Sequence, residues 1–179
     1  MRTKTYSIKS ELLRAALTAL IAVAVGVALP QFCHLAGSWL GIGSGLGEML
    51  LPMHLPVMLA GMVAGPAVGA LCGLASPLVS IWLTDMPGMA LLPFMMIELT
   101  VYGACAGLLR RTSLPLVAQV IITQVAGRGV RAMALATAVY GFGYTGLPIS
   151  IVWVSISAGA AGMVLQWVLL PLLVKRFDR

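Results

Sequence analysis

The sequence predicts an all-α integral membrane protein, a bundle of six transmembrane helices with the N- and C-termini in the cytoplasm. Its 179 residues are 60% hydrophobic and only 9% charged, whereas soluble domains carry about 25% charged residues. Glycine and proline divide the apolar sequence into six helical stretches, and a full membrane helix needs roughly 20 apolar residues. The Lys and Arg residues gather at alternate ends of these stretches, which indicates the orientation.

We expect one transmembrane domain over residues 1–179, with a first helix at roughly residues 11–35. The basic N-terminus is typical of a signal peptide, but the apolar run is long and lacks a small-residue cleavage site. We therefore expect this helix to be retained. Ala15, Ala19 and Ala22 lie on one of its faces. Small residues at that spacing let another helix approach closely, and that helix belongs either to this chain or to a partner subunit.

Residues 53–85 are almost continuously apolar and form a run too long for one straight span. The pair Gly65-Pro66 divides this run into a short helix at residues 55–64 and a full helix at residues 66–82. A break at bilayer depth is tolerated where protein or a watery cavity covers the backbone, and such breaks mark binding sites in transporters. The other interpretation is that the glycines only allow close helix packing.

The remaining helices are expected at residues 88–109, 114–140 and 147–174. Between the first two helices, residues 36–52 form a glycine-rich loop long enough to be a lid. Nine of the eleven Lys and Arg residues lie near the N-terminus, between the fourth and fifth helices, or at the C-terminus. The loops at 36–52, 84–88 and 141–147 contain none. The positive-inside rule therefore places both termini in the cytoplasm and these three loops outside.

Three charged residues lie deep within predicted spans, away from the helix ends, where charges are costly and usually functional. At 1.5 Å per residue, Glu98 and Arg128 lie about 18 and 21 Å above the cytoplasmic ends of their helices, so they can form a structural ion pair. The other interpretation is functional and concerns Arg131, which has no obvious acidic partner. Its fork can hold an anionic substrate group through two hydrogen bonds, which favours a carboxylate such as pantothenate over a neutral molecule.

Aromatic residues at the outer helix ends can stack on a flat ring, although each alone is more typical of an interface anchor. We expect no catalytic residues, no metal site and no cofactor on this chain. The expected substrate-binding residues are Arg131, Arg128, Glu98, Trp82, Asp85, Tyr140, Tyr144, Trp153, Trp39, Glu48 and His54.

Several function classes are disfavoured. The net charge of +6 follows from membrane topology and does not indicate nucleic-acid binding. The chain contains no glycine-rich phosphate loop ending in Lys-Ser/Thr, so any ATP hydrolysis belongs to partner subunits. A membrane enzyme would need a nucleophile with a base, or a metal cluster, and a secondary transporter would usually show two related halves. A self-sufficient secondary transporter or a membrane enzyme nevertheless stays the alternative.

Four motifs point to a known family: Met-His-Leu-Pro-Val-Met-Leu-Ala-Gly at 53–61, Gly-Pro-Ala-Val-Gly-Ala at 65–70, Leu-Ala-Ser-Pro-Leu at 74–78, and Ile-Glu-Leu-Thr-Val-Tyr-Gly at 97–103. With six expected helices, they resemble the S component of an energy-coupling factor transporter, in the vitamin-type branch. The resemblance covers nearly the whole chain and does not identify the substrate. Arg2 stands where the nickel and cobalt branch has His, which argues against metal import.

The resemblance implies uptake of a vitamin or related micronutrient across a prokaryotic plasma membrane. An S component captures its substrate outside the cell with high affinity. It then docks on a membrane scaffold subunit carried by two cytoplasmic ATPases, which bind the ATP. In this family an Ala-x-x-x-Ala face of the first helix meets the scaffold. Ala15 and Ala19 match that pattern, and Ala22 lies on the same face.

Overall fold

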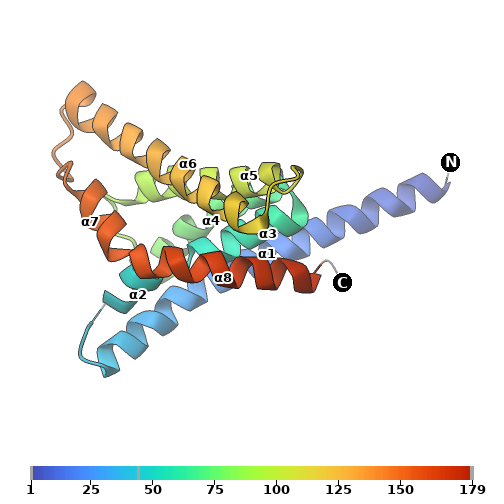
Figure 1. The fold of residues 1–179 in the computed structure, drawn as a ribbon, viewed down its shortest axis with the longest axis horizontal. Helices are drawn as coiled ribbons and strands as arrows, with labels where there is room; N and C mark the ends of the chain where they lie inside the picture. The colour runs from blue at the N-terminus through green and yellow to red at the C-terminus, as the bar shows by residue number, and fades with distance from the viewer. Residues whose placement is uncertain (1, 44, 178–179) are drawn as a thin grey trace.

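The computed structural model describes residues 2–43 and 45–177, with side chains from residue 9 onward. All regular structure in these ranges is helical, which confirms the all-α prediction (Figure 1). The helices in chain order are α1 (Arg2–Trp39), α2 (Gly45–Leu50), α3 (His54–Ala64), α4 (Pro66–Thr84), α5 (Leu92–Leu109), α6 (Leu116–Ala136), the π-helical turn η1 (Thr137–Gly141), α7 (Ile151–Ala158) and α8 (Ala160–Phe177).

Several helices have the length and composition of membrane spans. In the described part of the chain, five segments are long and apolar enough to cross a membrane: Lys9–Trp39, Gly45–Ala64, Pro66–Thr84, Leu92–Leu109 and Ala160–Phe177. The 21 residues of α6 are as long as a span, but α6 is not among these five segments. One of its faces carries Gln119, Gln124, Arg128 and Arg131, and all four are buried inside the protein. The fold is therefore that of an all-α membrane protein in which α6 turns its polar face inward.

The centre of the bundle is a close crossing of α3, α4 and α5. A Cβ atom on Gly103 of α5 would overlap the backbone of Gly69 in α4, and one on Gly61 of α3 would overlap the carbonyl of Gly103. Small residues allow this approach, and van der Waals contact between backbones holds helices together in lipid. Beside the crossing, Met58, Leu99 and Tyr102 are completely buried.

The predicted break at Gly65-Pro66 is present. Gly65 ends α3 and precedes α4 with φ +96° and ψ 169°, a positive-φ conformation that side chains with a Cβ rarely adopt. Pro66 follows at the first position of α4, where its missing N–H costs nothing and its fixed φ suits the helix. This pair is a sharp corner between two helices.

Two predicted boundaries are wrong. The loop expected at 36–52 is mostly helical, because α1 continues to Trp39 and α2 occupies Gly45–Leu50. The single helix expected at 147–174 is two helices, α7 and α8, which meet at Gly159. A Cβ atom on Gly159 would lie 2.8 Å from Leu51 Cδ1 and 3.0 Å from Arg128 Nη2. The break therefore falls where the chain packs against two other parts of the fold.

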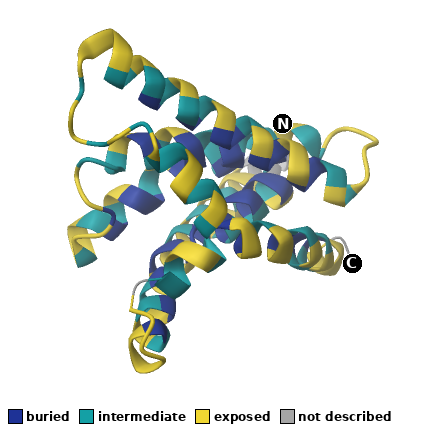
Figure 2. Ribbon diagram, turned by 60° about the vertical axis from the view of Figure 1, so that its left-hand side comes forward, coloured by how far each residue is buried: buried dark blue, intermediate teal, exposed yellow. Residues whose placement is uncertain are grey.

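Both termini lie at one end of the molecule, together with the connection from α5 to α6 (Figure 1). The helices α2 and α7 lie at the opposite end. Buried residues face the space between the helices and exposed residues face outward (Figure 2).

Candidate functional site

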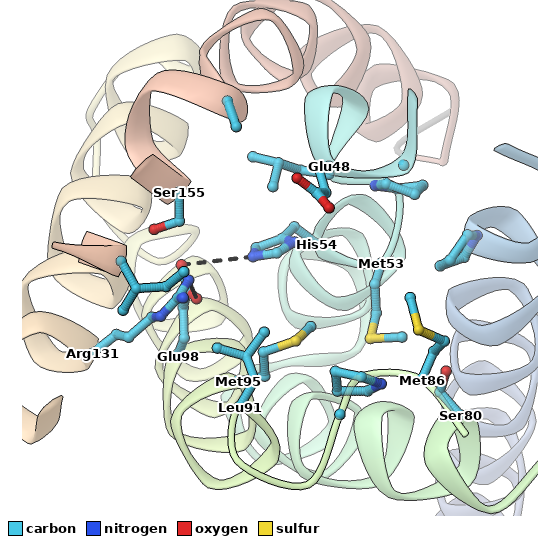
Figure 3. Close-up of a pocket in the computed structure, with 18 of the residues that line it drawn as sticks. Glu48, Met53, His54, Ser80, Met86, Leu91, Met95, Glu98, Arg131 and Ser155 are labelled. Carbon is cyan, nitrogen blue, oxygen red and sulfur yellow. Dashed lines mark hydrogen bonds and ion pairs between the residues drawn. The ribbon is translucent and has the colours of Figure 1, made fainter. Parts of the chain in front are cut away.

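A cavity of about 290 Å³ lies between α1, α2, α3, α4, α5, α6 and α7. Its walls are largely apolar, and several polar side chains converge on it from different helices (Figure 3). The polar lining consists of Gln31, His34, Glu48, His54, Ser80, Glu98, Arg128, Arg131 and Ser155. The apolar lining includes Leu51, Met53, Met86, Leu91, Met95, Ile151 and Val154. Ligand sites in proteins typically have about 300–1,000 Å³ and this mixture of apolar walls with a few polar groups.

The basic side chains of the buried cluster all contact one carboxylate, that of Glu98. Glu98 of α5 is completely buried, and its Oε2 accepts a hydrogen bond from Arg131 Nη1 at 2.9 Å. Its other oxygen, Oε1, lies 3.8 Å from Arg128 Nε and 3.7 Å from His54 Nε2 (Figure 3). The ring of His54 stands edge-on to Tyr102, with centroids 5.0 Å apart. Helices α3, α5 and α6 therefore meet through a single buried acid.

Both arginines pair with Glu98 in the structure. The predicted Glu98–Arg128 pair is present, with Nε 3.8 Å from Oε1. The expectation that Arg131 lacks an acidic partner is wrong, because Arg131 forms the short bond to Glu98. Arg128 also donates Nη1 to the Ser155 carbonyl at 3.1 Å and to Ser155 Oγ at 3.5 Å. The arginines are one turn apart, and an arginine side chain spans a turn of about 5.4 Å. Height along the helix therefore does not decide which arginine forms the hydrogen bond to Glu98. In the structure the Nη1 group of Arg128 is bonded to Ser155 of α7, and Arg131 forms that bond.

Several buried polar atoms of this cluster have no hydrogen-bond partner among the described residues. They are Nε and Nη2 of Arg128, Nε of Arg131, both ring nitrogens of His54, Oε1 of Glu98 and Oη of Tyr102. A buried donor without an acceptor costs about 1–3 kcal/mol, so such atoms usually meet a ligand or ordered water. A second void of about 10 Å³ borders Arg128 and Arg131, which is room for about one water.

The structure brings five of the eleven predicted site residues together at the cavity: Arg131, Arg128, Glu98, Glu48 and His54. The other six do not line it. Trp39, Trp82, Tyr140 and Trp153 are between 74% and 84% exposed. Such outward-facing rings are typical of anchors at a membrane interface. Asp85 is exposed at the end of α4. The hydroxyl of Tyr144 donates to the Ala90 carbonyl at 3.2 Å, and its ring packs on Phe94.

Four polar residues of the cavity were missed by the sequence reasoning: Gln31, His34, Ser80 and Ser155. Ser80 lies on the small and polar face of α4 with Gly73 and Ser76, and Ser155 begins a similar stripe with Gly159 and Gly162. Such stripes are the available signal in the sequence, although helix packing is their commoner role.

A polar network braces the helices beside the cavity. Gln124 of α6 donates to Gln166 Oε1 of α8 at 3.0 Å and accepts a hydrogen bond from Trp167 at 2.7 Å. Gln166 in turn donates to the carbonyl of Leu51 at 3.3 Å, in the link between α2 and α3. Leu51 itself lines the cavity. The network therefore ties one cavity wall to two long helices.

The predicted partner face of α1 is partly occupied by the chain itself. Ala22 is 7% exposed and belongs to the core, Ala19 packs against that core, and the Cys72 thiol of α4 lies 3.8 Å from the Ala19 carbonyl. Ala22 therefore packs within the chain, whereas Ala19 is half-buried and contacts the core with part of its surface. Ala15 is half-buried and lies further toward the N-terminus of α1.

No protein-family model, curated protein or solved structure matches the chain. Among the side chains that the structure describes, no three His, Cys, Asp or Glu residues gather into a group that could hold a metal ion. The chemistry of the site rests on the arginines, Glu98 and the imidazoles. Such a set can bind an ion or a polar molecule and hold it out of water.

Proposed function

We propose that this protein is the substrate-capture subunit of an energy-coupled importer for a vitamin or related micronutrient, an S component of an energy-coupling factor transporter. The observation that carries the proposal is the cavity of about 290 Å³ enclosed by helix ends, with a buried polar cluster in an otherwise apolar wall. Charged groups inside a membrane protein are costly and usually serve function. The proposal assigns them to binding a small polar molecule.

The distribution of charge supports capture from outside the cell. Lys175 and Arg176 lie in the last turn of α8, and Arg110 and Arg111 lie between α5 and α6. These positions share one end of the molecule with both termini (Figure 1), and the positive-inside rule assigns such an end to the cytoplasm. The α2 and α7 end, where the cavity lies, then faces outward. In this proposal ATP is hydrolysed on partner subunits.

A proton-coupled secondary transporter is a second candidate, and the contact of Glu98 with His54 favours it. Intramembrane carboxylates next to histidines are typical of proton relays in transporters. In that case the isolated chain would move its substrate without partner subunits. The two candidates therefore differ in what the protein does alone.

The test is tagged purification from a bacterial membrane, followed by mass spectrometry of proteins and of small molecules released by denaturation. We expect a bound micronutrient and, under mild solubilisation, a scaffold subunit with two ATPases. The released molecule is then labelled and offered to liposomes that contain the chain alone. Binding without accumulation under a proton gradient supports the capture role. Accumulation driven by that gradient would replace it with secondary transport.

A further inference from the structure

We propose that the molecule held in the cavity is a small monoanion, a carboxylate or a group of equivalent charge, and that Arg128 is the residue that binds this group. The inference rests on the proposed capture function for its setting. It adds to that function the charge class of the cargo and the residue that recognises it.

The first step is the charge of the buried cluster. Glu98 and Arg131 are joined by a 2.9 Å hydrogen bond and neutralise each other. Arg128 is only 9% exposed, and its nearest approach to Glu98 is 3.8 Å, which is longer than a hydrogen bond. One positive charge is therefore in excess beside a largely apolar cavity. Glu48 also lines the cavity, but it is an exposed residue of α2, where solvent screens its charge.

The second step is the hydrogen bonding of Arg128. Its guanidinium carries five N–H groups. Nη1 is engaged by Ser155, and the three N–H groups on Nε and Nη2 meet no acceptor within the described part of the chain. Water in the neighbouring void could accept one of these bonds, but a neutral molecule cannot offset the charge. An anion does both, because a carboxylate accepts two hydrogen bonds from one guanidinium.

Residues of α7 and the glycine that follows it hold the Arg128 side chain in place. Ser155 Oγ donates to the carbonyl of Val152 at 3.0 Å, which orients the serine that receives Nη1. Gly159 leaves room for Nη2, because a Cβ there would lie only 3.0 Å from it. Helix α7 thus helps to position Arg128 at the cavity wall. Arg131 forms the hydrogen-bonded ion pair with Glu98, so Arg128, at 3.8 Å, is the more loosely paired of the two arginines.

The apolar wall of the cavity indicates the chemistry of the rest of the cargo. Met53, Met86, Met95 and Leu91 line the cavity (Figure 3), and thioether side chains adapt to irregular ligand shapes. The cargo therefore combines one acidic group with a mainly apolar body. This excludes polyanions such as nucleotides, for which one surplus charge is too little.

The experiment uses the full-length protein in detergent. A bacterial small-molecule extract is separated by ion exchange into anionic, cationic and neutral fractions, and each is tested for thermal stabilisation of four proteins. These are the parent, Arg128→Gln, Arg128→Lys, and Arg111→Gln as matched control, because Arg111 is exposed in the α5–α6 connection. The anionic fraction should stabilise the parent and Arg111→Gln and should not stabilise Arg128→Gln. For the monoanion purified from that fraction, Arg128→Gln should weaken binding on the order of tenfold to a hundredfold.

The other outcomes distinguish a failure of the monoanion proposal from a failure of the proposed capture function. Stabilisation by the cationic or neutral fraction alone would leave the capture role standing and overturn the monoanion. Equal stabilisation of the parent and Arg128→Gln by the anionic fraction would remove Arg128 from the site. Stabilisation by none of the fractions would count against capture itself, and the inference would fall with it. If Arg128→Gln does not fold, Arg128→Lys decides, since it keeps the charge, loses the planar fork and should bind the purified monoanion more weakly.

Discussion

Arg131 Nη1 lies 2.9 Å from Glu98 Oε2, and this hydrogen-bonded ion pair joins α6 to α5 where Glu98 has no exposed surface. A charge at that depth is tolerable because its partner is in contact with it. The pair makes α5 and α6 depend on each other, and it separates the structural arginine from Arg128, which lies one turn below it.

The pair predicts opposite effects for the two arginines on the empty protein. Arg131→Gln leaves the Glu98 carboxylate without its hydrogen-bonded partner, and removing one member of a buried pair costs about 3–5 kcal/mol. Arg128→Gln removes the surplus charge and leaves the neutral pair intact, so stability should be equal to the parent's or higher. Unfolding in mixed micelles measures both. The double variant Glu98→Gln with Arg131→Gln should recover part of the loss, and equal losses for both arginines would contradict the assignment.

The glycine crossing predicts a strong effect of one methyl group. Gly103→Ala places a Cβ against the backbone of Gly69, which cannot move aside as a flexible side chain can. Overpacking of this kind costs about 1–3 kcal/mol. The control is Gly129→Ala on α6, where a Cβ meets nothing within 4 Å and replacing glycine should stabilise the helix by roughly 0.5–1 kcal/mol. A neutral Gly103→Ala variant would show that the three helices are packed less closely than the structure has them.

The glutamine network predicts that a change in α8 is felt at the cavity wall. Gln166→Leu removes the bonds to Gln124 and to the Leu51 carbonyl, which leaves buried groups unsatisfied at about 1–3 kcal/mol. Amide exchange in residues 45–51 should then become faster, because the link from α2 to α3 loses its tie to α8. Ser157→Ala, which removes an exposed local hydrogen bond on α7, serves as control. Unchanged exchange at 45–51 would mean that close packing alone holds the link.

Helix α1 predicts a difference between two alanines that the sequence places on one face. Ala22→Trp should prevent folding, since Ala22 is 7% exposed inside the core and the larger ring has no room. Ala15→Trp should fold and bind the purified monoanion as the parent does. Under the proposed function it should also weaken docking to the scaffold subunit, because close helix approach is lost. Pull-down of the ATPases measures this, and normal recovery with Ala15→Trp would place docking elsewhere.

Features that depend on local backbone preference or on composition could be predicted from the sequence, whereas contacts between side chains could not. Gly65-Pro66 was predicted correctly because their backbone preferences act locally. Glu98, Arg128 and Arg131 were found because a charge inside an apolar segment can be recognised without knowing the fold. The predicted Glu98–Arg128 pair is present, but the closer pair of Glu98 with Arg131 was missed, since spacing along a helix does not give the direction of a long side chain. The outward rings of Trp82 and Trp153 were assigned to the site because anchors and stacking groups share one composition, and only burial separates them.

The inward-facing polarity of α6 has a consequence for biogenesis. On the scale that describes recognition of a segment by the translocon, an arginine at the centre of a helix opposes insertion by about 2.5–3.5 kcal/mol, and α6 carries two, with two glutamines. It should therefore enter the bilayer poorly as a segment on its own. The preceding helix brings the acid that neutralises Arg131, so α5 and α6 form the smallest unit that can be integrated together. We therefore expect α5 and α6 to enter the bilayer as a pair, with the Glu98–Arg131 contact already formed.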